Sequence, residues 1–176
     1  GGLRNVLTEG PITCENIYEI LPFEKTTEEQ QMLDEAVAAA RNAEVVVLVL
    51  GGSELTVRED RSRTCLDLPG HQQELMQAIH ATGKPTVLVL LDGRAATINY
   101  AAILHAWFPG EFAGTAVAEA LFADYNPGGR LAVTFPKSVG QIPFAFPFKP
   151  GSDEPCETAV YGALYPFGYG LSYTKF

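Results

Sequence analysis

The strongest constraint on the fold is an unbroken apolar run that passes directly into a charged loop. Val45 to Leu50 are all apolar and mostly β-branched, which predicts a strand buried on both faces in a parallel sheet. Gly51 and Gly52 end the run. In open parallel sheets, ligands bind beyond the carboxyl ends of the strands, so the loop that follows is the first candidate for a functional site. Its charged residues are Glu54, Arg58, Glu59, Asp60, Arg61 and Arg63.

Helical and strand patterns alternate along the rest of the chain. Thr26 with Glu29, or Thr27 with Gln30, fits a capping box, and apolar residues then recur at helical spacing to Ala40. This alternation predicts an α/β fold, a three-layer α/β/α sandwich with a mainly parallel sheet, within a single domain of residues 1–176. Further helices are expected at about 70–82 and 111–122, and further strands at 86–92, 102–108 and 131–135.

The two ends of the chain lack the clear helical and strand patterns of the α/β core, which spans about 26–136. Residues 137–176 are rich in proline and aromatic side chains and follow neither period, which predicts an irregular but ordered tail that wraps the domain or docks on a neighbour. Asn5 to Leu7 fits the end of a strand, and Ile12 to Leu21 a short helix. The chain begins without a Met and is interpreted as a piece of a larger protein.

Composition argues against several classes of partner. The net charge is −9 and the pI is about 4.7, which argues against nucleic acid, and the apolar runs are of strand length, too short to span a membrane. The three cysteines, Cys14, Cys65 and Cys156, lack zinc-site spacing. We expect them to be unpaired and packed in the ordinary way.

Three common site chemistries find weak support. Gly51-Gly52-Ser53 lacks both the GxGxxG and the GxxxxGK[ST] patterns of phosphate-binding loops. His71, His80 and His105 are expected in a helix or an apolar strand, and no GxSxG elbow accompanies them. No ligand cluster predicts a metal site.

The remaining candidates for site chemistry are the carboxylates. Glycoside hydrolysis needs one protonated acid at the leaving oxygen and a second carboxylate as nucleophile or base. A carboxylate in the charged loop meets the positional demand, and by pattern its partner would be Asp92, at the end of the neighbouring strand. The alternatives are a solvated charged loop and a simple Asp92-Gly93 turn.

Several stretches together resemble one family. They are AWFPGEFAGTAVAEALFADYNPGGRLAVTFPKSVGQIP, RTCLDLPGHQQELMQAI, GKPTVLVLLDGR and the terminal YPFGYGLSYT. Together they resemble the C-terminal, second α/β-sandwich domain of family 3 glycoside hydrolases, of the β-glucosidase and β-xylosidase type. The resemblance implies that a TIM-like barrel domain, which this sequence does not contain, supplies the aspartate nucleophile.

By this resemblance the general acid/base is Glu59, with Glu54 as the fallback because the loop varies in length across the family. Arg63 matches an arginine that would pin the loop, and Arg58 would face the sugar, so both are candidate substrate-binding residues. The resemblance argues against Asp92 as the second catalytic carboxylate, since the family usually has Asn in that turn.

The resemblance implies half the active site of a retaining exo-β-glycosidase, which would release terminal β-linked glucose from oligosaccharides or glycosides. It implies no cofactor and no metal, and a periplasmic or secreted location. The alternatives are a β-xylosidase of the same family and a non-catalytic domain that binds sugar or shapes an interface.

Overall fold

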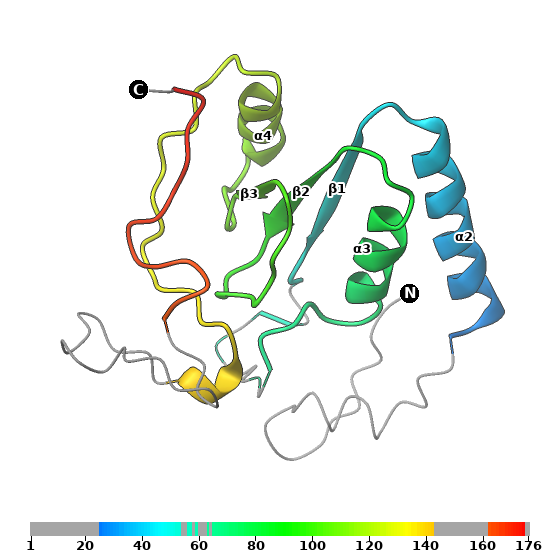
Figure 1. Cartoon of the computed structure of the whole chain (residues 1–176), viewed down its shortest axis with the longest axis horizontal. Helices are drawn as coiled ribbons and strands as arrows, with labels where there is room; N and C mark the ends of the chain where they lie inside the picture. The colour runs from blue at the N-terminus through cyan, green and yellow to red at the C-terminus, as the bar shows by residue number, and fades with distance from the viewer. Residues whose placement is uncertain are drawn as a thin grey trace. The chain divides into compact units, whose positions relative to one another are not determined.

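The computed structural model of the chain describes residues 25–53, 56–57, 59, 63, 65–142 and 162–174. They divide into two compact units (Figure 1). The first holds the described residues up to Arg94 together with Tyr100–Trp107, and the second holds Ala95–Asn99 and the described residues from Phe108 onward. The strand end and short helix interpreted in residues 1–24 lie outside the described residues.

A parallel sheet forms the centre of the first unit. Its strands are β1 (Val46–Gly51), β2 (Thr86–Leu91) and β3 (Ile103–His105), in the order β1-β2-β3. Both pairings are parallel, and the β1–β2 register runs from Val46 opposite Thr86 to Gly51 opposite Leu91. The predicted α/β class with a parallel sheet is confirmed.

Two helices of the first unit are layered beside the sheet. The capping box of Thr26 and Glu29 starts α2 (Thr27–Asn42). It is the first of the two capping boxes that the sequence predicted. Helix α3 (Gln72–His80) packs on β1, and α2 packs on α3 (Figure 1). The buried residues of the two helices are Ala40, Met76 and Ile79.

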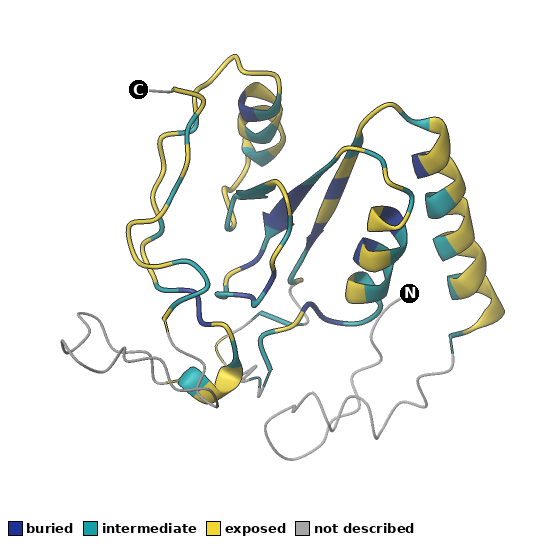
Figure 2. Ribbon diagram, viewed as in Figure 1, coloured by how far each residue is buried: buried dark blue, intermediate teal, exposed yellow. Residues whose placement is uncertain are grey.

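The two central strands are buried to different extents. Leu88, Val89 and Leu90 of β2 are all buried, so both faces of this strand are covered. In β1 burial alternates, and Val47 and Val49 are 50% and 54% exposed (Figure 2). The prediction of burial on both faces is therefore wrong for β1: α3 packs on it, and the side chains of Val47 and Val49 on the other face stay largely exposed.

In the second unit, residues 131–135 are hydrogen-bonded to residues 165–169 of the tail. Leu131 N–H donates to the Tyr169 carbonyl at 2.9 Å, and Phe135 N–H donates to the Tyr165 carbonyl at 2.8 Å. The predicted strand at 131–135 is wrong: within this range only Phe135 forms a bridge, an isolated antiparallel one to Tyr165. The described part of the tail does pack along its own unit, and it includes one 3₁₀ turn, η1 (Val139–Gln141).

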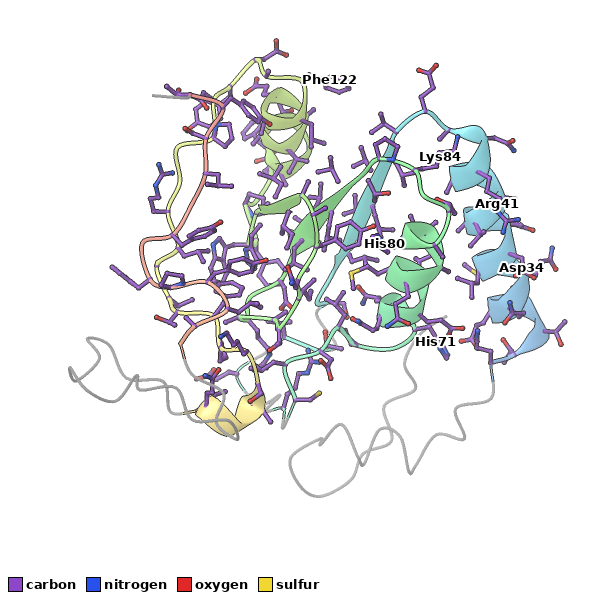
Figure 3. All side chains as sticks on the ribbon, viewed as in Figure 1. Asp34, Arg41, His71, His80, Lys84 and Phe122 are labelled. Carbon is purple, nitrogen blue, oxygen red and sulfur yellow. The ribbon has the colours of Figure 1, made fainter. Side chains whose placement is uncertain are left out.

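Helix α4 (Ala113–Leu121) is fixed to the end of the tail. The Tyr173 hydroxyl donates to the Ala120 carbonyl at 2.6 Å, and Asn126 Oδ1 accepts from Tyr173 N–H at 2.8 Å. Phe122, just after the helix, is 80% exposed and projects from its end (Figure 3).

We expect Gly51→Ala to lower the free energy of unfolding by roughly 2–5 kcal/mol. Gly51 has φ +149°, and a Cβ there would lie 1.8 Å from the Leu91 carbonyl oxygen, so the paired strands would have to separate. Urea denaturation measures the change. Gly83→Ala is the matched control, because its φ is also positive, +72°, but open space surrounds it; its cost should be only about 1 kcal/mol. Equal costs at the two positions would contradict the steric argument.

Candidate active site

The candidate site begins where β1 and β2 end. Gly51 and Leu91 are paired in a parallel ladder, so the loop after β1 and the turn after β2 leave the sheet at the same edge. Gly52 N–H extends the contact by donating to the Leu91 carbonyl at 2.9 Å. We call residues 52–63 the Glu59 loop.

Hydrogen bonds and close packing fix the start of this loop. Gln72, the first residue of α3, donates to the Gly51 carbonyl at 2.8 Å and accepts from the Gly51 N–H at 2.7 Å. A Cβ on Gly52 would lie 2.2 Å from Val57 Cγ2 and 3.0 Å from Asp92 Oδ1, so these two side chains pack closely against Gly52 where any other residue would carry its side chain. The first part of the Glu59 loop is therefore held against the sheet edge.

A small turn follows at the beginning of the loop. Thr56 N–H and Val57 N–H both donate to the Ser53 carbonyl at 2.9 Å. Ser53 N–H in turn donates to Thr56 Oγ1 at 2.8 Å. These bonds reverse the chain within a few residues and fold Val57 back over Gly52.

Glu59 lies beyond this turn, and its side chain is exposed. A carboxylate that is to act on an external substrate must reach solvent, and Glu59 meets that condition. The fallback acid Glu54 and the candidate sugar ligand Arg58 lie outside the described residues.

Arg63 at the far end of the loop is partly buried and bonded within the protein. Its guanidinium donates to the Asp67 carbonyl and approaches Cys65 Sγ at 3.7 Å. Cys65 is disulfide-bonded, so the expectation that all three cysteines are unpaired is wrong. Cys14 and Cys156 lie outside the described residues, and their wide separation from Cys65 gave no spacing signal for a bridge.

Asp92 is a fully buried charged residue at the same sheet edge, with 0% of its surface exposed. Its Oδ1 accepts from Arg94 N–H at 3.2 Å, whereas Oδ2 has no hydrogen-bond partner among the described residues. Burial raises the pKa of the Asp92 carboxyl, and the positive charge of Arg63 opposes that rise. The pattern predicted a carboxylate here, but its burial prevents it from meeting an external substrate directly.

The histidines occupy other parts of the first unit. His71 and His80 lie at opposite ends of α3 (Figure 3). His71 Nδ1 is 3.4 Å from Glu74 Oε2, and the His80 ring meets the Tyr100 ring edge-on at 5.6 Å. Burial lowers the pKa of His105 in β3. These contacts agree with the interpretation of the histidines as packed or surface residues.

Among the described residues, no group of three or more His, Cys, Asp or Glu side chains is gathered as a metal ion would require. None of the helices in this part of the chain is both long enough and apolar enough for a membrane span.

Comparison with known proteins identifies the family. The sequence profile described as "Glycosyl hydrolase family 3 C-terminal domain" matches residues 2–173. The chain belongs to glycosyl hydrolase family 3. It is 42% identical over 96% of its length to a periplasmic β-glucosidase of Salmonella typhimurium. It is 47% identical over 81% of its length to a β-xylosidase of Formosa agariphila.

Solved structures of the family show the same fold. A β-glucosidase from Erythrobacter marinus matches 86% of the chain at 42% identity, with a TM-score of 0.78. A β-glucosidase from Listeria innocua in complex with glucose matches 86% at 31% identity, with a TM-score of 0.76. The chain covers 24% and 21% of the two curated relatives and 22% and 23% of the two solved chains, so it spans about a quarter of these proteins.

The raised pKa of Asp92 predicts a pH dependence of stability. The folded chain keeps the Asp92 proton above the ordinary value of 3.8, where the unfolded chain has lost it. The folded state then binds more protons, so this contribution is fully present below about pH 4 and is lost as pH rises through the raised value. We expect Asp92→Asn to remove that loss, so that the variant gains stability relative to the wild type as pH rises.

Urea denaturation at a series of pH values measures this difference. Asp124→Asn is the matched control, because Asp124 is exposed and its variant should keep the wild-type pH dependence. Parallel curves for wild type and Asp92→Asn across the range would show that burial of Asp92 does not favour its protonated form.

Proposed function

We propose that this chain is the acid/base-bearing domain of a retaining exo-acting β-glycosidase that removes terminal β-linked glucose from oligosaccharides or glycosides. The observation that carries the proposal is the exposed Glu59 on a loop anchored at the carboxyl edge of a parallel sheet. Family membership supports glycoside hydrolysis, and relatives named β-glucosidase support glucose as the sugar released.

Glu59 would act twice in this reaction. In the first step its carboxyl donates a proton to the glycosidic oxygen as the bond to the leaving group breaks. In the second step its carboxylate takes a proton from water, which attacks the glycosyl-enzyme and releases the sugar with retained configuration. The two steps use protein carboxylates and water, so no cofactor or metal enters them.

The second carboxylate comes from outside this chain. We propose that an aspartate on an N-terminal TIM-like barrel domain is the nucleophile, and that its carboxyl lies roughly 5–5.5 Å from that of Glu59 in the assembled site, as retaining enzymes require. Arg58 would face the bound sugar. Arg63, which is bonded to the Asp67 carbonyl, would contribute to substrate binding by fixing the loop.

We further propose a periplasmic or secreted location. The disulfide at Cys65 fits an oxidising compartment, since disulfides are rare in reducing ones. The Salmonella relative is named a periplasmic enzyme.

A β-xylosidase is the second candidate, because the Formosa agariphila relative carries that name at 47% identity. We expect kcat/KM to be higher for an aryl β-glucoside than for the matching aryl β-xyloside. A preference for the xyloside would transfer the proposal to β-xylosidase activity. A non-catalytic sugar-binding or interface domain is less well supported, since it would have no need of an exposed carboxylate at position 59.

Glu59→Ala in the complete two-domain enzyme tests the acid/base role. We expect kcat/KM for cellobiose, which has a poor leaving group, to fall by roughly 10²–10⁴-fold. An activated aryl glucoside should lose less in its first step, because its leaving group needs no proton. Azide should speed its turnover and yield a β-glucosyl azide, since azide attacks the glycosyl-enzyme without a general base.

Two further variants test whether the loss of activity is specific to Glu59. Glu111→Ala removes an exposed carboxylate elsewhere and should leave both substrates unaffected. Glu54→Ala should also retain activity on cellobiose. If Glu54→Ala, and not Glu59→Ala, shows the loss and the azide rescue, the acid/base is the fallback residue.

A further inference from the structure

We propose that β1 is an interior strand of its sheet in the complete protein, and that a further parallel strand pairs with it on the side away from β2. This added strand belongs to the part of the same polypeptide that precedes residue 1. We call the backbone groups with which it would pair, those of Val47 and Val49, the outer side of β1. The proposal is independent of the role assigned to Glu59.

Alternate residues of β1 direct their backbone groups to opposite sides of the strand. Val46 N–H donates to the Pro85 carbonyl at 2.8 Å, at the start of the ladder with β2. Because backbone groups alternate along an extended strand, the N–H and carbonyl groups of Val47 and Val49 face away from β2. Among the described residues, β2 is the only strand that pairs with β1. The outer side is therefore a template for a further strand.

Gln72 shows where such pairing would have to end. Gly51 is the next residue after Val49 whose backbone groups face outward, and both are bonded to the Gln72 side chain, at 2.7 and 2.8 Å. The Gln72 amide thus occupies the place that the backbone of a neighbouring strand would take. The outer side is closed at Gly51, so an added strand would pair with Val47 and Val49 and diverge before Gly51.

The sequence of β1 lacks the features that keep an exposed strand from pairing. Strands left at the side of a sheet commonly carry charged residues, prolines or bulges, whereas β1 reads VVLVLG. The side chains of Val47 and Val49 are 50% and 54% exposed, and an added strand would bring its own side chains beside them. A continuous apolar run of this kind is typical of an interior strand of a parallel sheet.

The position of α2 also indicates a strand on the outer side. Helix α2 leads into β1 and packs on α3, so the two helices form one layer, and α2 lies beyond α3 on the side away from β2 (Figure 1). Crossovers between parallel strands are right-handed in nearly all proteins. Two helices in one layer must then carry the chain across the sheet in the same direction. Since α3 carries it from β1 to β2, the strand from which α2 comes lies on the outer side of β1.

The length of the related proteins favours the same polypeptide as the source of the strand. The matching profile describes a C-terminal domain, and the chain covers only 24% and 21% of the two curated relatives. A protein of this family therefore has much further chain before this domain. Such a strand would be present in every molecule, whereas pairing with a second copy would depend on protein concentration.

Hydrogen exchange in the complete enzyme, resolved to single amides by fragmentation in the mass spectrometer, tests the pairing without any substitution. Leu48 N–H is the internal control, because it faces β2 in the ladder. We expect the amides of Val47 and Val49 to exchange within about tenfold of the Leu48 rate. If they exchange on the order of 100-fold or more faster, the outer side is free and the proposal fails.

A pair of proline variants provides a second test of the pairing. Val47→Pro removes an N–H from the outer side, and Leu48→Pro removes one that faces β2. We expect both to lower the thermal midpoint of the complete enzyme to a similar extent. Proline is tolerated where the missing N–H would face solvent, so a near-normal midpoint for Val47→Pro alone would contradict the proposal. If neither variant folds, the exchange rates of the wild type decide.

Photocrosslinking identifies the occupant. With p-benzoylphenylalanine in place of Val49, we expect a crosslink within one polypeptide, to a segment that precedes residue 1. The same group in place of Phe122, which is 80% exposed in the second unit, should not reach that segment. A crosslink between two copies, or protection of Val47 that is lost when the enzyme is diluted to a monomer, would assign the outer side to a second copy and overturn the proposal. No crosslink to a preceding segment would overturn it as well.

Discussion

The parallel pairing of β1 with β2 is the constraint on which the rest of the site depends. Because Gly51 lies opposite Leu91, the Glu59 loop and the turn of Asp92 start from adjacent points. A slip of one residue would turn every side chain of β1 to the other face. It would also place a side chain where only a glycine fits against the Leu91 carbonyl. Backbone packing therefore sets the geometry of the site before any ionisable side chain is considered.

Asp92 places a buried carboxyl group at this edge of the sheet. A buried carboxylate with an oxygen that lacks a hydrogen bond is unfavourable for folding, and a neutral side chain of the same size would avoid the cost. The positive charges of Arg63 and Arg94 offset part of that cost. Sites at which a local rule is broken without gain to the fold are those where function is expected.

Local patterns predicted the elements well, and long-range contacts account for the differences. The capping box at Thr26 and the apolar run of β2 are read directly from neighbouring residues, and the structure contains both. Residues 131–135 have an equally good strand pattern, but the distant Tyr165 and Tyr169 occupy their hydrogen bonds. No local period encodes that pairing. The exposed face of β1 is also decided at long range, since an apolar run does not reveal whether a second layer covers both of its faces.

The sequence predicted where the candidate loop begins but not the contacts that hold it. The apolar run of β1 placed a charged loop at the carboxyl edge of a parallel sheet, and the family resemblance, not the pattern, selected Glu59 within it. The two hydrogen bonds between the Gln72 side chain and the Gly51 backbone, and the disulfide at Cys65, join residues far apart in sequence, and no sequence motif predicts them. Glu59 is exposed, while the start of its loop is held at the sheet edge by Gln72 and by the turn at Ser53. A sheet edge with fixed backbone geometry therefore presents an exposed carboxylate, which is the arrangement that the proposed acid/base role requires.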